Sequence, residues 1–136
     1  MEDTILVPIA PAELFDKIAI LEIKEQRSSD PEKLTNVHYE LNLLRDIFDK
    51  QIKPTPKLDM LLAKLRELSA NGWDIEDGKR RCEKEKKFDD EFIQYARGAF
   101  KNNDKRATVK KEINLILGSK IMEEKLYEKQ SWQMEL

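Results

Sequence analysis

Residues 73–125 read WDIEDGKRRCEKEKKFDDEFIQYARGAFKNNDKRATVKKEINLILGSKIMEEK, and the charge pattern of this stretch most strongly shapes the expected fold. Its charges change from basic to acidic twice, after Lys87 and after Lys101. Because the helix dipole favours cations at the end of one helix and anions at the start of the next, each change marks a boundary. The stretch therefore predicts three helices, at about residues 73–86, 89–101 and 104–128. Gly118 is a position where the last of them would bend or break.

Proline and N-cap residues mark the helix starts in the first half of the chain. Pro11 suits a first helical turn, where a missing N–H group costs nothing. Asp30-Pro31 and Thr55-Pro56 each place an N-cap residue before such a proline. These signals predict helices that begin at or near residues 11, 31 and 56.

Two leucine-rich seams follow these starts with the spacing of amphipathic helices. The first comprises Leu34, Val37, Leu41, Leu44 and Phe48, and the second comprises Leu58, Leu61, Leu62, Leu65 and Leu68. Gly72 is expected to cap the end of the second helix. A short proline-containing linker joins the two helices, so we expect them to fold back as an antiparallel hairpin over residues 31–72.

Length and composition favour a single all-α domain. The chain has 136 residues, of which 38% are charged, and its net charge is only -2. Both charge signs are interspersed, as in amphipathic helices that carry many i,i+4 pairs. We therefore expect one domain over residues 1–136, a bundle of five or six helices with the polar-rich helices at 73–128. The β-branched, proline-interrupted residues 1–10 predict an extended arm or an edge strand.

The net charge, the apolar runs and the cysteine count also limit the binding partners and the cellular location that we expect. A net charge of -2 supplies no positive field to hold nucleic acid. No apolar run approaches the roughly 20 residues of a membrane-spanning helix, and the single Cys82 forbids an internal disulfide. We expect a cytoplasmic protein that binds neither membranes nor nucleic acid. We also expect a homodimer, formed through the N-terminal arm and the spare apolar surface of the first helix.

Several standard reaction centres are absent from the sequence. One histidine and one cysteine cannot supply a zinc site of the usual ligands. Neither a glycine-rich phosphate loop nor a nucleophile elbow occurs. We therefore expect no metal and no cofactor, and the sequence leaves open whether the protein is an enzyme.

Acidic residues on apolar helix faces are the candidates for proton transfer. At 100° per residue, Glu22 falls between Ile18 and Phe15, inside the apolar arc of its helix. Glu124 falls in the apolar stripe of the last predicted helix, provided that Gly118 does not reset the register. A carboxylate in such a position forms an ion pair, is protonated, or takes part in binding or catalysis. Both residues are therefore catalytic candidates. A structural salt bridge is the alternative for each.

Other polar residues are candidates for ligand binding. The anion-binding candidates are Lys17, Arg97, Arg106, Lys110 and Asn114. Arg106 and Lys110 lie four residues apart at the predicted start of a helix, where free backbone N–H groups favour an anion. A further polar cluster consists of Glu76, Asp77 and Arg80. Local pairing is the alternative explanation for both sets.

Five segments of the chain carry a resemblance to a known family. They are DKIAILEIK at 16–24, NVHYEL at 36–41, WDIED at 73–77, ARGAFKNNDKRA at 96–107 and INLILGSKIMEEKLY at 113–127. Together they resemble a family of small uncharacterised proteins from bacteria and marine phages, a domain of unknown function. The resemblance implies bacterial members encoded near glycosyltransferases and other surface-polysaccharide genes. The chain departs from the family pattern at Gly78, Lys79 and Arg81, which implies either looser packing there or pairing with something that other members lack.

Two functional hypotheses follow. The leading one is a non-catalytic helical interaction or accessory module, which the resemblance links to surface-polysaccharide assembly or its phage counterpart. It rests on the lack of a nucleophile, a metal-ligand set and a phosphate loop. The alternative is an enzyme or binder for an anionic metabolite, such as a sugar phosphate or a carboxylate, with Arg, Lys and Glu in an inter-helical pocket. That alternative requires Glu22 and at least two of the candidate cations around one cavity.

Overall fold

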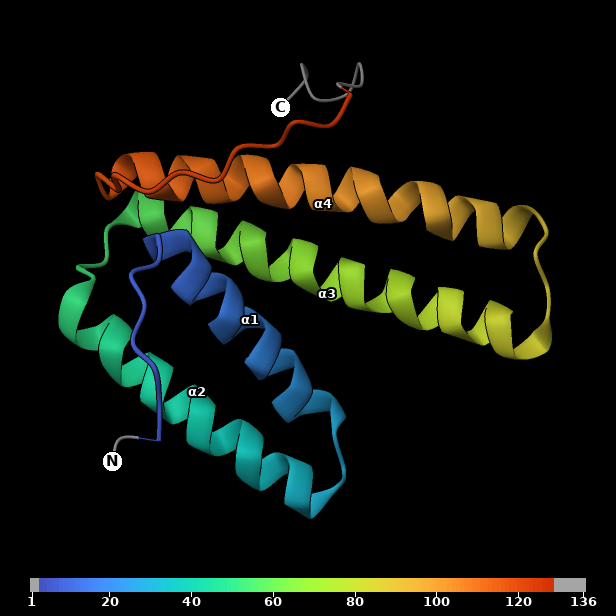
Figure 1. Ribbon diagram of the computed structural model, residues 1–136, viewed down its shortest axis with the longest axis horizontal. Helices are drawn as coiled ribbons and strands as arrows, with labels where there is room; N and C mark the ends of the chain where they lie inside the picture. The colour runs from blue at the N-terminus through green and yellow to red at the C-terminus, as the bar shows by residue number, and fades with distance from the viewer. Residues whose placement is uncertain (1–2, 129–136) are drawn as a thin grey trace.

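The computed structural model describes residues 3–128 and contains four helices and, over this range, no strand (Figure 1). The helices are α1 (Pro11–Arg27), α2 (Pro31–Gln51), α3 (Pro56–Glu85) and α4 (Asp90–Ile116). The all-α class is confirmed. The expected five or six helices are wrong, because α3 and α4 each join two predicted helices into one.

The predicted helix starts near residues 11, 31, 56 and 89 are confirmed, whereas those at residues 73 and 104 are wrong. Each of α1, α2 and α3 has a proline in its first turn. The Asp30 carboxylate accepts a hydrogen bond from the Glu32 N–H at 3.0 Å, and Thr55 Oγ1 accepts one from the Leu58 N–H at 3.2 Å. The Asp89 side chain caps α4 in the same way. These side chains satisfy first-turn N–H groups that a helix leaves without partners.

Gly72 lies inside α3 and is not the helix cap expected there. A Cβ atom at Gly72 would lie 2.8 Å from Nδ2 of Asn102 on α4. That nitrogen donates a hydrogen bond to the Leu68 carbonyl oxygen at 3.0 Å, and Asn102 is buried. A Cβ at Gly78 would likewise overlap the ring of Tyr95. Both glycines therefore allow α3 and α4 to approach closely, which is why α3 continues through them.

The boundary expected at residues 101–104 is also wrong. Asn102 is buried against α3 and serves the interface between the two helices, so α4 passes through this segment without a break. Arg106 and Lys110 consequently lie in the interior of α4. Backbone N–H groups in a helix interior are already bonded within the helix. The anion-attracting helix start expected at these two residues is therefore absent.

α4 ends just before Gly118, so the helix expected to reach residue 128 is wrong beyond that point. Gly118 has a φ of 69°, and the Ser119 N–H donates to the Asn114 carbonyl oxygen at 2.9 Å. This is a Schellman cap, which requires the left-handed backbone that glycine adopts readily. Residues 119–128 contain no helix and run back along α4 (Figure 1). The break resets the register, and Glu124 is exposed.

α1 is the central element of the fold and contacts the other three helices. Ala12 and Phe15 pack with leucines of α3 and with Ile113 of α4. Ile18 belongs to a second buried cluster with Leu41 of α2. In Figure 1, α1 accordingly lies between α2 and the α3–α4 pair. A helix that is covered on two sides must be apolar around most of its circumference, and seven residues of α1 are buried and apolar.

The antiparallel hairpin expected over residues 31–72 is wrong. α2 packs against α1, whereas α3 runs antiparallel to α4 over most of its length (Figure 1). The leucines of the α3 seam are buried as predicted, but α1 and α4 cover them. A seam identifies which face of a helix is buried and carries no information about which helix covers it.

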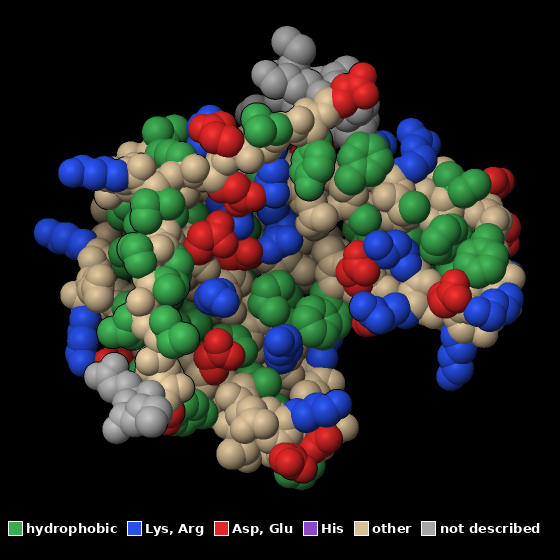
Figure 2. All heavy atoms as spheres, in the orientation of Figure 1, with side chains coloured by type: hydrophobic (Ala, Val, Ile, Leu, Met, Phe, Trp, Pro, Cys, Tyr) green, Lys and Arg blue, Asp and Glu red, His purple; other side chains and the backbone are tan. Residues whose placement is uncertain are grey.

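Residues 3–9 precede α1 and form neither helix nor strand. Their apolar side chains are exposed, 90% for Ile5 and 86% for Leu6, and hydrophobic side chains gather over this arm in Figure 2. The expected homodimer stays a prediction as far as this arm is concerned, but the apolar surface of α1 that was expected to contribute to it is buried against the other three helices. None of the helices in the described part of the chain is long and apolar enough to cross a membrane.

Candidate functional site

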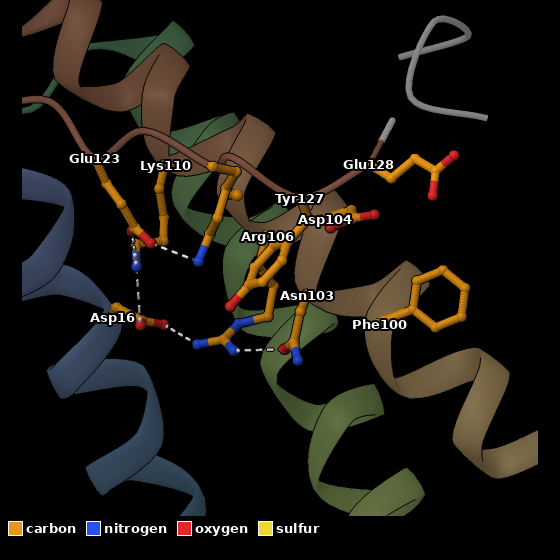
Figure 3. Close-up of a pocket in the computed structure, with 11 residues that line it drawn as sticks. Asp16, Phe100, Asn103, Asp104, Arg106, Lys110, Glu123, Tyr127 and Glu128 are labelled. Carbon is orange, nitrogen blue, oxygen red and sulfur yellow. Dashed lines mark hydrogen bonds and ion pairs between the residues drawn. The ribbon is translucent and has the colours of Figure 1, made fainter. Parts of the chain in front are cut away.

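A pocket of about 540 Å³, here called the charged pocket, lies where α1 and the C-terminal segment meet α4 (Figure 3). Lys, Arg, Asp and Glu side chains gather on this part of the surface (Figure 2). Asp16 of α1 points toward two cations of α4. Its Oδ1 lies 2.6 Å from Nη2 of Arg106, and its Oδ2 lies 3.4 Å from Nζ of Lys110. One carboxylate thus pairs with two of the predicted anion-binding residues.

Lys110 has further acidic partners. Its Nζ lies 2.6 Å from Glu13 and 3.6 Å from Glu123, and Glu123 also pairs with Lys125 at 2.5 Å. Burial alone would lower the pKa of Lys110, but the hydrogen bond to Glu13 and the charge of Asp16 outweigh burial and raise this pKa. The hydrogen bond from Lys125 and the charge of Lys110 lower the pKa of Glu123, against the opposing effect of burial. The charged pocket therefore holds a closed network of ion pairs.

Asn114, expected to complete an anion pocket, has a structural partner. Its Oδ1 accepts a hydrogen bond from the Ala12 N–H at 2.9 Å, and both residues are buried. Ala10, the N-cap of α1, offers no side-chain hydrogen bond. Asn114 therefore caps the start of α1 from the end of α4.

A second pocket of about 320 Å³, the central pocket, lies between α3 and α4 beside α1. It is lined by Ile20, Ser69, Gly72, Trp73, Glu76, Asp77, Arg80, Ala99, Asn103 and Arg106. The cluster of Glu76, Asp77 and Arg80 is thus brought together here. Glu76 pairs with Lys79 at 2.8 Å, whereas the Asp77 and Arg80 side chains make no hydrogen bond or ion pair with another residue of 3–128. Asp77 and Arg80 are therefore available to a ligand.

Two buried polar atoms of residues that line the central pocket have no hydrogen-bond partner among the described residues. They are the Oγ of Ser69 and the Nε of Arg106. Ser69 is only 2% exposed. A buried polar group without a partner costs about 1–3 kcal/mol, and folded proteins contain few of them. An occupant of the pocket would remove this cost only where it comes within hydrogen-bond reach of these two atoms.

A third pocket of about 570 Å³, the basic corner, lies at the junction of α1 and α2 and faces α3. It is lined by Lys24, Arg27, Ser28, Lys33, Asn36, Val37, Trp73 and Asp77. The surface in Figure 2 is indented between this end of the α1–α2 pair and the α3–α4 pair. The basic corner shares Trp73 and Asp77 with the central pocket, which in turn shares Asn103 and Arg106 with the charged pocket. The three pockets therefore lie next to one another.

The remaining candidates lie outside these three pockets. Glu22 pairs with Arg66 at 3.1 Å and with Arg45 at 3.4 Å, and it lines none of the three. Lys17 and Arg97 are exposed and line none of them either, as is also true of Glu124. Glu22 therefore does not share these pockets with the candidate cations. Over residues 3–128, no three His, Cys, Asp or Glu side chains are grouped as metal ligands.

Ser69 and Asp16 are among the pocket residues that the sequence patterns did not single out. Ser69 continues the spacing of Leu62 and Leu65 on the buried face of α3, so a small polar residue on an apolar seam was the available signal. Asp16 gave no comparable signal, because its partner Arg106 lies 90 residues away in the chain. Contacts at such a separation depend on how the helices pack and not on local spacing.

Comparison with known proteins gives a family but no activity. No curated protein and no solved structure matches the chain significantly. The bacterial or phage origin and the neighbourhood of glycosyltransferase genes stay predictions. The profile of the family of unknown function DUF6165 matches residues 5–132, and the chain therefore belongs to this family.

Proposed function

We propose that this protein is a non-catalytic binder of a small, hydroxyl-bearing polar molecule, which occupies the central pocket. The observation that carries this proposal is the pair of buried polar atoms without partners, Ser69 Oγ and Arg106 Nε, on residues that line that pocket. A hydroxyl group of the ligand both donates and accepts, so it is suited to partner a serine hydroxyl and a guanidinium N–H.

The size and lining of the pocket support a small ligand. About 320 Å³ lies within the range of small-molecule sites, which is roughly 300–1,000 Å³. Trp73 supplies an apolar wall, while Asp77 and Arg80 supply one free charge of each sign. An apolar wall with a few placed polar groups is the usual composition of a ligand site. A compact polyol or sugar derivative fits this combination.

Binding is better supported than catalysis. Glu22 is engaged by Arg66 and Arg45, and Glu124 is exposed and lines none of the three pockets. A general acid or base must come within hydrogen-bond reach of the proton that it transfers. Neither candidate meets that condition for a ligand in the central pocket.

A thermal-shift screen tests the proposal with sugars, phosphosugars, nucleotide sugars and dicarboxylates as probes. A ligand at 100 times its Kd stabilises the native state by about 2.7 kcal/mol, so the melting temperature must rise. Ser69→Ala should leave the stability of the free protein unchanged or slightly higher, because the hydroxyl has no protein partner to lose. The same substitution should remove most of the ligand-induced shift.

The control is Ser29→Ala, at an exposed position between α1 and α2. It should change neither the stability nor the shift. The proposal fails if no probe raises the melting temperature, or if Ser69→Ala keeps the full shift of a probe that does.

The interaction-module hypothesis is a second candidate, favoured by a different observation. The N-terminal arm exposes Ile5, Leu6 and Val7 by 90%, 86% and 65%. Exposed apolar segments of this kind mark contact sites for other protein surfaces. We propose a second copy of the chain as the partner, and light scattering at tens of micromolar that reports a monomer would exclude it. A link of either function to polysaccharide assembly stays a prediction.

A further inference from the structure

We propose that the basic corner binds the phosphate group of a soluble phosphate monoester whose remaining part lies against Trp73 and reaches the central pocket. This inference rests on the proposed function, because it assigns a chemical class to the same ligand. It also places the anion at the α1–α2 junction and not at the predicted Arg106 and Lys110.

The cations of the basic corner are available to a ligand. The Lys24 and Lys33 side chains are exposed, line the pocket and make no hydrogen bond or ion pair with another described residue. Arg27 is held by Asp74 at 2.5 Å, which fixes its guanidinium at the edge of the pocket. The corner therefore combines two free ammonium groups with one positioned guanidinium.

The cations of the charged pocket are already neutralised. Asp16 pairs with both Arg106 and Lys110, and Glu13 and Glu123 add two more carboxylates around Lys110. An incoming anion there would have to displace carboxylates that are part of the chain. At the basic corner Arg27 is also paired, with Asp74, but Lys24 and Lys33 have no carboxylate partner among the described residues, so the corner is the more favourable place for an anion.

The charge of the corner favours an anion. Three cations and one carboxylate, Asp77, line it, and Asp74 pairs with one of the cations, Arg27, so the corner keeps an excess of positive charge although the whole chain has a net charge of -2. A phosphate monoester carries a charge of about -1.5 to -2 at pH 7 and three acceptor oxygens. The Asn36 amide and the Ser28 hydroxyl, which also line the corner, supply neutral donors for those oxygens.

The two helices present these groups with matching periodicity. Lys24, Arg27 and Ser28 follow the i, i+3, i+4 spacing at the end of α1, and Lys33, Asn36 and Val37 repeat it at the start of α2. Residues with this spacing lie on one face of a helix. Asp30 already caps the first N–H groups of α2, so the corner is a side-chain site and not a helix N-terminus.

Trp73 and Asp77 lie at the border between the anion site and the central pocket, because they line both. A ligand with its phosphate among the three cations can therefore place an adjoining ring against the indole. Its hydroxyl groups would then come within reach of Asp77, Arg80 and Ser69. A free phosphate ion would use the corner alone, and a phosphosugar would use both pockets.

The test is a two-dimensional NMR titration with inorganic phosphate and with glucose 6-phosphate. Inorganic phosphate should shift the amide signals of residues 24–37 and 73–77 saturably, and glucose 6-phosphate should bind more tightly. Lys24→Gln combined with Lys33→Gln should weaken both ligands by about tenfold or more, since each charge about 4 Å from the anion contributes roughly fivefold even in water.

The matched control combines Lys17→Gln with Arg97→Gln. This control also removes two positive charges, so it changes the net charge by the same amount. The two cations are exposed and line none of the three pockets. The control should leave both affinities within about twofold, because the contribution of a distant exposed charge is screened by salt. Equal weakening in both double variants would overturn the assignment. Shifts centred on Arg106 and Lys110 would overturn it as well.

Further experiments distinguish the anion site from the proposed central-pocket function, and a soluble ligand from a lipid headgroup. Ser69→Ala should weaken glucose 6-phosphate and leave inorganic phosphate unchanged. If phosphate binds as expected but no probe responds to Ser69→Ala, the central-pocket function fails and the anion site stands. Sedimentation of the protein with phosphatidylcholine vesicles that contain phosphatidic acid, but not with vesicles that lack it, would show a lipid headgroup and overturn the soluble ligand.

Discussion

Replacement of Asn114 by alanine tests the architecture most directly, because one hydrogen bond joins the end of α4 to the start of α1. The Ala12 N–H donates to Asn114 Oδ1 at 2.9 Å, with Ala12 0% and Asn114 3% exposed. Asn114→Ala would leave this N–H buried without a partner, at a cost of about 1–3 kcal/mol. The truncated side chain also leaves a small void, so we expect a loss near the middle of that range, about 2 kcal/mol.

Urea and thermal unfolding followed by circular dichroism measure this loss. For 136 residues with an unfolding entropy of about 2.1 cal/mol/K per residue, about 2 kcal/mol lowers Tm by roughly 7 °C. Asn114→Asp keeps an acceptor oxygen at the N-terminus of α1, where the helix dipole favours a negative charge, so it should lose less. Asn71→Ala, at an exposed position on α3, is the control and should change stability by less than about 0.5 kcal/mol. Equal losses in Asn114→Ala and Asn71→Ala would refute the reasoning.

Three further perturbations test the α3–α4 pair and the C-terminal segment. Gly78→Ala should destabilise by about 1–3 kcal/mol in urea unfolding, because its Cβ overlaps the Tyr95 ring; an unchanged midpoint would show that the helices can separate there. Lys86→Gly should stabilise by up to about 1 kcal/mol, since Lys86 ends α3 with a φ of 55°, and a loss of stability would contradict the cap. The pKa of Glu123 is lowered from 4.5, so its contacts with Lys110 are present above that pH and are lost as the pH falls through the lowered value. Amide signals of residues 119–125 should therefore shift below about pH 4.5 in the native protein but not in Glu123→Gln.

The ion pairs around Lys110 and the free charges around Trp73 have different consequences for the molecule. Lys110 is surrounded by Glu13, Asp16 and Glu123, so its charge joins α1, α4 and the C-terminal segment. The charges near Trp73 are left without partners among the described residues, at Lys24, Lys33, Asp77 and Arg80. Paired groups hold helices together, whereas unpaired groups that line a pocket are free to meet a ligand. This contrast favours the central pocket and the adjoining basic corner as the binding site.

Local signals in the chain were sufficient for the fold class and for the helix starts. Asp30, Thr55 and Asp89 cap helices through N–H groups two or three residues away, so their role is readable from neighbouring sequence. The buried faces of α1 and α3 were likewise readable, because burial of one face imposes a period of 3.6 residues. Glu22 fell inside an apolar arc and is indeed half-buried and paired.

Long-range packing decided the helix count, the pairing of the helices and the place of the pockets. Gly72 resembles a helix end in sequence, but an asparagine side chain 30 residues away occupies the space beside it. Asp16 pairs with Arg106 across 90 residues. Ser69, Trp73, Asp77 and Arg80 share one face of α3 through local helical spacing, but they line a cavity only because residues of α1 and α4 lie over that face. Capping contacts and hydrophobic periodicity involve residues within one or two helical turns of each other, so both can be recognised in the amino-acid sequence. Contacts between helices depend on which apolar faces meet, and the same leucine seam is compatible with several partners until the whole molecule folds.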